Sequence, residues 1–221
     1  MSLKSRLALR FLIALVVFGT LLFIPAGSFR FWQGWTYLVI FFVPGLLGFV
    51  YFYKHDPELV ERRLRLKEKV REQRRIMTFV YVIWLIALLI PGLDHRFGWS
   101  HLPSDLALAS QVVVFGGYLL TLWVVKVNRF AARTIQVEPG QTVVSTGPYG
   151  IVRHPMYLGV CATLLFTPLA LGSYFALPVF VLLIPLVVLR LLNEEKVLRN
   201  ELPGYPEYCL HTRFRLIPFL W

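Results

Sequence analysis

Several long apolar stretches restrict the folds open to this chain of 221 residues. A helix needs about 20 mainly apolar residues to cross the hydrocarbon core of a bilayer. Hydrophobicity predicts six such spans, at about residues 7–26, 35–53, 76–92, 107–127, 155–172 and 174–192. Hydrophobic residues make up 57% of the chain, whereas about 45–50% is usual in soluble domains. The predicted fold class is therefore all-α, a polytopic integral membrane helix bundle of about six transmembrane helices.

Turn residues separate these spans. Pro91 and Gly92 are predicted to stop the third span, and Gly172 and Ser173 form a turn between the last two. The basic N-terminus and the apolar run after it are predicted to form an anchor rather than a removed signal. A loop is expected after Gly92, and it holds two histidines and two aspartates without metal-ligand spacing: Asp94, His95, His101 and Asp105. No metal site is predicted there.

Positive charge is distributed unevenly between the two ends of the predicted spans. If both termini lie on one side, all 23 lysines and arginines except Arg30 and Arg96 fall on that side. Cytosolic loops carry the excess of Lys and Arg in membrane proteins. We therefore predict that both termini are cytosolic. This bias accounts for the net charge of +11 without a nucleic-acid partner.

Residues 54–75 are dense in basic and acidic side chains and poor in apolar ones. We predict a charged helix near the membrane surface that acts as a solvated connector; a role in lipid-headgroup binding or substrate gating is the alternative. The chain is divided accordingly into residues 1–106, which hold the first helices and this connector, and residues 107–221.

Two polar segments interrupt the apolar pattern of the second half. In the first, residues 141–159, Pro155 suits the first turn of a helix, which places His154 at the N-cap. Backbone N–H groups at that helix start could hold a carboxylate, and Tyr157 faces the same side one turn later. In the second, Arg190 and Glu194 are four residues apart and share a helix face.

Ionisable groups at membrane depth are costly, so they suggest a functional site. A tight re-entry turn and an intrahelical ion pair are the structural alternatives. The charge pattern predicts that both polar segments lie on the cytosolic side, where they can form one reaction site.

The polar segments of the second half contain three motifs: Gly147-Pro148-Tyr149-x3-Arg153-His154-Pro155-x-Tyr157-x-Gly159, Arg190-x3-Glu194-Glu195-x2-Leu198 and Gly204-Tyr205-x2-Tyr208. Their order and spacing resemble the isoprenylcysteine carboxyl methyltransferase family. The resemblance covers about residues 107–221, and the first three spans do not carry it. A wider group includes phospholipid N-methyltransferases and, more distantly, the C-terminal part of steroid 5α-reductases.

This resemblance implies a cofactor, S-adenosylmethionine (SAM), bound at the cytosolic end of the C-terminal helices. Arg190 and Glu194 are the expected catalytic residues, and Arg190 is expected to hold a substrate carboxylate. Arg153 is expected to bind substrate or, with Glu195, to hold in place the residues that contact the ligands. Tyr205 and Tyr208 are expected to help cover the site. The implied cofactor-binding residues are Gln136, Gln141, Thr142, Val143, Val144, Tyr149, His154, Pro155, Met156, Tyr157 and Glu194.

The expected activity is SAM-dependent O-methylation of a carboxylate on a lipid-like or prenylcysteine-like molecule, by a multi-pass membrane protein whose site faces the cytosol. N-methylation of a phospholipid amine is an alternative, although Arg190 favours an anionic acceptor. An NADPH-dependent reductase of the steroid 5α-reductase type is another, and a non-catalytic scaffold or small transporter is a third. No metal is expected, and Cys161 and Cys209 are expected to be ordinary thiols.

Overall fold

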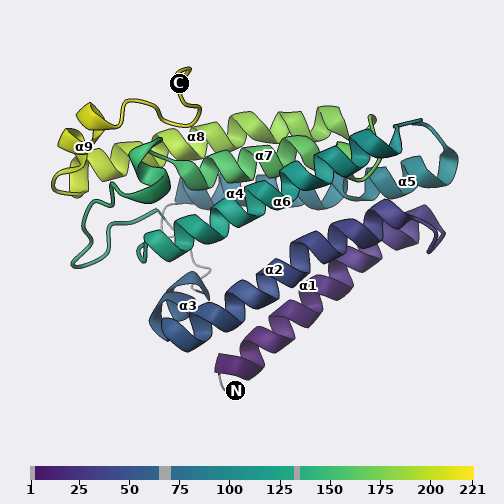
Figure 1. The fold of residues 1–221 in the computed structure, drawn as a ribbon, viewed down its shortest axis with the longest axis horizontal. Helices are drawn as coiled ribbons and strands as arrows, with labels where there is room; N and C mark the ends of the chain where they lie inside the picture. Colours follow the sequence, from purple (N-terminus) through teal and green to yellow (C-terminus); the bar gives the residue numbers. More distant parts are fainter. Residues whose placement is uncertain (1–2, 65–70, 132–134) are drawn as a thin grey trace.

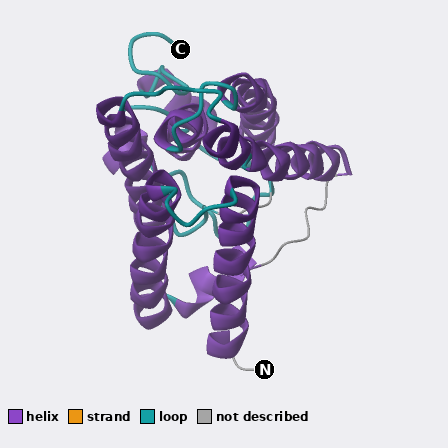
Figure 2. Ribbon diagram, turned by 90° about the vertical axis from the view of Figure 1, so that its right-hand side faces the viewer, coloured by secondary structure: helices purple, strands orange, loops and turns teal. Residues whose placement is uncertain are grey.

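The computed structural model describes residues 3–64, 71–131 and 135–221 and is helical throughout those ranges apart from turns and loops. No strand occurs in the described ranges (Figure 2), which confirms the all-α class. The helices are α1 (Leu3–Ala26), α2 (Trp32–His55), α3 (Pro57–Leu64), α4 (Arg71–Ala87), α5 (Leu89–Phe97), α6 (Ser104–Val127), the 3₁₀ turn η1 (Gly147–Gly150), α7 (Pro155–Ala170), α8 (Leu177–Glu201) and α9 (Tyr205–His211).

Five helical stretches in the described residues are long and apolar enough to cross a membrane. They are α1, α2, residues 74–97 across α4 and α5, α6 and α8. The predicted fifth span corresponds to α7, an apolar helix of 16 residues. The count of six spans and the cytosolic placement of both termini stay predictions, whereas the multi-pass helical architecture is confirmed.

The predicted stop at Pro91 and Gly92 is wrong, because helix α5 continues to Phe97. The helical path breaks at Leu88 instead, so Pro91 falls in the first turn of α5, where its missing N–H costs no intrahelical hydrogen bond. Gly92 lets α1 approach closely, since a Cβ there would lie 2.6 Å from the Leu22 carbonyl oxygen. The last predicted span, about residues 174–192, corresponds to the apolar part of α8, and the helix itself extends to Glu201.

Asp94 was predicted in an interfacial loop, but it lies in α5 and is 2% exposed. Its carboxylate accepts hydrogen bonds from the Ser100 backbone N–H (2.6 Å), the Ser100 hydroxyl (2.7 Å) and the Ser173 hydroxyl. Asp94 therefore ties the loop before α6 to the turn between α7 and α8. Figure 1 shows these loops at one end of the molecule and α3, α9 and the C-terminus toward the other.

Helices α6 and α7 pack closely through two glycines. A Cβ at Gly159 would lie 2.6 Å from the Gly117 carbonyl oxygen, and a Cβ at Gly117 would lie 2.8 Å from the Gly159 carbonyl oxygen. Small residues allow helix backbones to approach in this way inside membranes. The glycine at the end of the first sequence motif is therefore required by the contact that holds α7 against α6.

Gly159→Ala is expected to destabilise the protein by about 1–3 kcal/mol, because backbone atoms at this contact cannot move aside cheaply. Gly116→Ala is the matched control, since a Cβ at Gly116 would meet nothing within 4 Å. Thermal unfolding in detergent measures both variants. Equal midpoints for the two alanine variants would show that the α6–α7 contact tolerates a methyl group.

Candidate active site

The first polar segment is held in place by the C-terminal segment of the chain. The backbone N–H of Arg153 donates to the Phe214 carbonyl oxygen, and the N–H of His154 donates to the Arg215 carbonyl oxygen, both at 2.9 Å. Because the two stretches pair through their backbones, residues 153–154 enter α7 in a fixed orientation. The C-terminal segment is therefore part of the site's framework.

His154 is the N-cap of α7 and Pro155 is the first residue of that helix, as the sequence predicts. The His154 side chain is 4% exposed, and its Nε2 lies 3.4 Å from the Tyr205 hydroxyl. Burial lowers the pKa of His154 below its ordinary value, although Glu194 and Glu195 act in the opposite direction. The imidazole is therefore neutral at pH 7.

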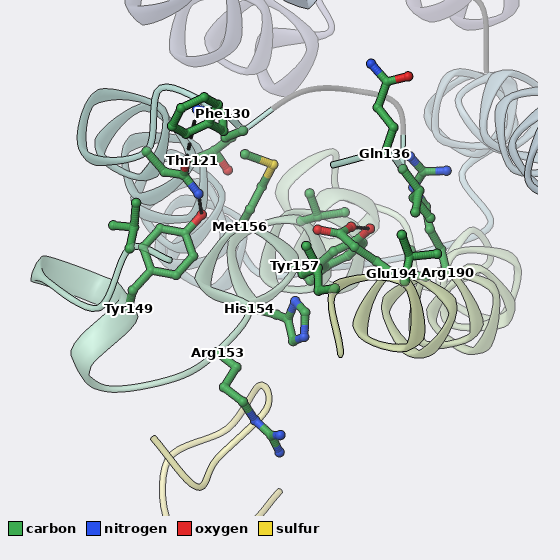
Figure 3. A pocket seen from close by; sticks show the side chains of 18 of the residues that line it. Thr121, Phe130, Gln136, Tyr149, Arg153, His154, Met156, Tyr157, Arg190 and Glu194 are labelled. Carbon is green, nitrogen blue, oxygen red and sulfur yellow. Dashed lines mark hydrogen bonds between the residues drawn. The ribbon is translucent and has the colours of Figure 1, made fainter. Parts of the chain in front are cut away.

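A side-chain contact joins the two polar segments. The Tyr157 hydroxyl on α7 donates to Glu194 Oε2 on α8 at 2.6 Å, drawn as a dashed line in Figure 3. Arg190 lies one turn before Glu194 on α8 and is 9% exposed. The Tyr157 phenol and the Glu194 carboxylate are thus joined between α7 and α8, and Arg190 lines the same cavity as both.

Glu195 is the centre of a cluster of three arginines. Its Oε1 accepts from Arg153 at 2.5 Å and from Arg199 at 2.8 Å, and its Oε2 accepts from Arg215 at 2.6 Å. The side chains of Glu195 and Arg153 are only 4% and 6% exposed. Arg153 also donates to the Arg213 carbonyl oxygen. These bonds favour the supporting role for Arg153 over direct substrate binding.

A cavity of about 470 Å³ lies between the helices and the loop after α6. Every residue predicted to bind cofactor or substrate lines it, with the exception of Pro155, which is buried. The lining residues that the sequence predicts are Gln136, Gln141, Thr142, Val143, Val144, Tyr149, Arg153, His154, Met156, Tyr157, Arg190, Glu194, Tyr205 and Tyr208.

Hydrogen bonds fix the polar wall of the cavity. The Tyr149 hydroxyl accepts from the Asn128 side chain at 2.9 Å, and the Tyr208 hydroxyl donates to the Tyr149 carbonyl oxygen at 2.7 Å. The Gln136 amide donates to Glu138 at 2.5 Å, and the Gln141 side chain accepts from the Glu138 backbone N–H at 2.9 Å. Burial raises the pKa of Tyr149 and of Tyr208, the latter to about 12, so both phenols stay protonated at pH 7.

The rest of the cavity is mainly apolar, and two helices outside the motifs, α2 and α4, form part of it together with α8. Phe41 comes from α2, Val80 and Trp84 from α4, and Leu186 and Val187 from α8. The sequence did not predict the contribution of α2 and α4, because nothing in an apolar span shows which face turns toward a cavity. The polar side chains therefore line one part of a cavity that extends between apolar helices.

In the part of the chain that the structure describes, no three His, Cys, Asp or Glu side chains form a group that could bind a metal ion. Cys161 and Cys209 are both free thiols.

The fold and the site define a multi-pass helical membrane protein with a partly polar cavity between its helices. Residues 107–200 match the model of the Isoprenylcysteine carboxyl methyltransferase (ICMT) family, which confirms the resemblance seen in the motifs. The matched segment runs from α6 to the end of α8 and includes both polar segments.

A second similarity is to the Delta(14)-sterol reductase TM7SF2 of Mus musculus. The two are 31% identical over 91 residues, which is 40% of this chain and 22% of that protein. The chain thus spans about a fifth of the length of that relative.

Proposed function

We propose that this protein is a SAM-dependent methyltransferase that O-methylates the carboxylate of a lipid-like or prenylcysteine-like acceptor. The observation that carries the proposal is that the hydrogen-bonded pair Tyr157–Glu194 and Arg190 line one cavity that is otherwise mainly apolar. The match of residues 107–200 to the ICMT family supports the same reaction class.

The cavity suits this cofactor in size and in chemistry. Its volume of about 470 Å³ lies in the range of small-molecule sites. Glu194 offers a carboxylate to cationic groups, while the neutral His154 and the protonated Tyr149 offer polar contacts without charge. When bound, SAM supplies a methyl group activated by a sulfonium. Gln136, residues 141–144, His154, Met156 and Tyr157 are the residues proposed to hold it.

The protein's own contribution is to bind and orient the acceptor. A carboxylate is already ionised at pH 7, so no general base is required. Arg190 presents a planar, permanently charged guanidinium that can orient a carboxylate through two parallel hydrogen bonds. Holding reacting groups in line supplies much of the rate enhancement in such a reaction. Because Arg190 is 9% exposed, it acts where little water competes.

The apolar part of the cavity favours an acceptor with a hydrocarbon portion. Phe41 on α2 and Trp84 on α4 lie on its wall, so such a chain could enter from the bilayer while the cofactor arrives from the water. The concentration of Lys and Arg on one predicted side supports a site that faces the cytosol.

SAM binding tests the proposal directly. The purified protein in detergent is expected to bind SAM, and Glu194→Ala is expected to weaken binding by about tenfold or more, since a charge-assisted contact is lost. Glu201→Ala is the matched control, because Glu201 is an exposed carboxylate on the same helix. Isothermal titration calorimetry measures the dissociation constants. Equal affinities of wild type and Glu194→Ala would contradict the assigned role of Glu194.

A reductase is the second candidate, favoured by the similarity to the mouse sterol reductase. Thermal-shift measurements with SAM and with NADPH separate the two, because a ligand that binds the folded state raises the unfolding midpoint. Stabilisation by NADPH alone would replace the methyltransferase proposal. A methyl-transfer screen with labelled SAM against prenylcysteine analogues, fatty acids and phospholipids then separates O-methylation from N-methylation.

A further inference from the structure

The end of the chain folds into a closed turn, the C-terminal turn, which consists of residues 215–221. The backbone N–H groups of Leu216 and Ile217 both donate to the Trp221 carbonyl oxygen, at 2.9 and 3.1 Å. The Trp221 N–H donates back to the Ile217 carbonyl oxygen at 3.1 Å. Arg215 lies over the Trp221 ring, 5.4 Å from its centroid, and Leu216 is buried. The inner side of the turn is therefore fixed by hydrogen bonds and packing.

The outer side of the C-terminal turn is apolar. Phe219 is 90% exposed and Leu220 is 77% exposed, and Ile217 is exposed as well. In the described ranges Phe219 is the one residue other than glycine with a positive φ, 65°. A bulky side chain rarely adopts this conformation, and backbone strain of this kind is concentrated at functional sites. The turn thus presents large apolar side chains outward, which indicates an interaction surface.

The position of the turn along α8 points to the surface of the bilayer. The Nε of Arg215 donates to Glu195 Oε2 at 2.6 Å. Glu195 lies within one helical turn of Leu192, where the apolar part of α8 ends. The C-terminal turn is therefore held at the depth where the predicted span meets the lipid headgroups.

The turn also lies at the edge of the bundle. In Figure 1 the chain returns from α9 along α8 before it ends, and Figure 2 shows the same end at the periphery of the molecule. On α8, Leu182 and Leu189 are both exposed, as expected of a helix that faces lipid. Arg213, just before the turn, is exposed too, and a basic side chain is attracted to the anionic headgroups of a membrane surface.

We propose that the C-terminal turn inserts Phe219 and Leu220 into the headgroup region of the bilayer, at the end of the bundle that carries the candidate site. A lipid surface accounts for the apolar edge better than a second protein does, because the turn lies at the depth of the interface and continues the apolar surface of α8. The inference does not depend on the reaction that the site performs.

This contact links the membrane to the framework of the site. The carbonyl oxygens of Phe214 and Arg215 accept the backbone hydrogen bonds that fix the entry to α7. Phe214 also packs against Phe219, with their ring centroids 5.4 Å apart. A bilayer that holds Phe219 therefore holds the segment that orients the first polar segment.

A fluorophore at position 220 tests the inference in the full-length protein. Cys161 and Cys209 are replaced by alanine, Leu220→Cys is labelled with an environment-sensitive NBD maleimide, and the protein is placed in phosphatidylcholine–phosphatidylglycerol nanodiscs. Glu207→Cys in the same background is the matched control, because Glu207 is exposed on α9. The emission wavelength reports the polarity around the label, and doxyl-labelled lipids quench labels that they contact. Phe219→Trp in the natural background gives an independent reading through quenching by brominated lipids.

The label at position 220 is expected to emit at a shorter wavelength than the label at position 207, and to lose several times more of its emission to doxyl lipids. Adding Phe219→Ser should move its emission to longer wavelength, since serine inserts less favourably than a large apolar side chain. Unfolding midpoints equal to that of wild type show that the variants are folded.

Equal emission and equal quenching at the two positions, with no added quenching in Phe219→Trp, would overturn the inference by placing the turn in water. Emission at short wavelength without quenching by lipid would overturn it as well, because a protein surface, such as a second copy of this chain, would then cover the turn.

Discussion

Arg190→Ala is expected to reduce methyl transfer by about a hundredfold or more while the affinity for SAM changes little. Removal of a preorganised group that orients or stabilises the reacting atoms costs a factor of about 10²–10³ in turnover. Arg190 is proposed to hold the acceptor, whereas Glu194 is proposed to contact the cofactor. Single-turnover transfer from labelled SAM measures the chemical step, and calorimetry measures cofactor affinity on the same preparations.

Arg190→Lys provides the graded comparison. Lysine keeps the charge but lacks the planar fork, so it should recover part of the lost rate. Loss of SAM binding in Arg190→Ala, with an unchanged unfolding midpoint, would assign Arg190 to the cofactor instead of the acceptor. Turnover at the wild-type rate would remove Arg190 from the reaction altogether.

Glu195→Gln is expected to destabilise the protein by about 3–5 kcal/mol, because removal of one partner leaves a buried charge unpaired. The unpaired charge is that of Arg153, whose side chain is 6% exposed. The backbone N–H of Arg153 is bonded to Phe214, and the residue directly precedes His154. Displacement of Arg153 should therefore also weaken SAM binding.

The same cluster contains its own control. Arg199 pairs with Glu195 at 2.8 Å, but its side chain is 44% exposed, and an exposed ion pair contributes about 0–1 kcal/mol. Arg199→Gln should therefore change the unfolding midpoint much less than Glu195→Gln does. Thermal unfolding in detergent measures both variants. Similar midpoints would show that the burial of Arg153 does not determine how much this cluster contributes to the stability of the protein.

The sequence predicted much of the site because the local conformation around several motif residues depends only on their neighbours in the chain. Pro155 opens α7 and His154 caps it, as proline at a first helical position requires. Arg190 and Glu194 share one face of α8, since residues four apart lie one turn apart. The cavity then brings these residues together with Tyr149 and Tyr157.

One sequence prediction about the helices was wrong, and one residue of the cavity wall was missed. The stop at Pro91 was wrong because proline is accepted in the first turn of a helix, and the break at Leu88 has no marker in the sequence. The place of Arg63 in that wall was missed because residues 54–75, of which 65–70 lie outside the described residues, look like any solvated charged segment. Leu59 and Val60 are buried, and the ion pair of Asp56 with Arg129 ties the start of α3 to a loop that is remote in sequence.

The sequence by itself determined the helical class and the apolar spans, which follow from hydrophobicity and turn chemistry, and its motifs supplied the residues of the candidate site through their resemblance to a known family. Tertiary structure alone decided which helix faces line the cavity, that the C-terminal segment fixes Arg153 and His154, and that α3 brings Arg63 to the wall. These contacts join residues far apart in the chain. Packing between helices selects them, and no local pattern along an apolar helix encodes that choice.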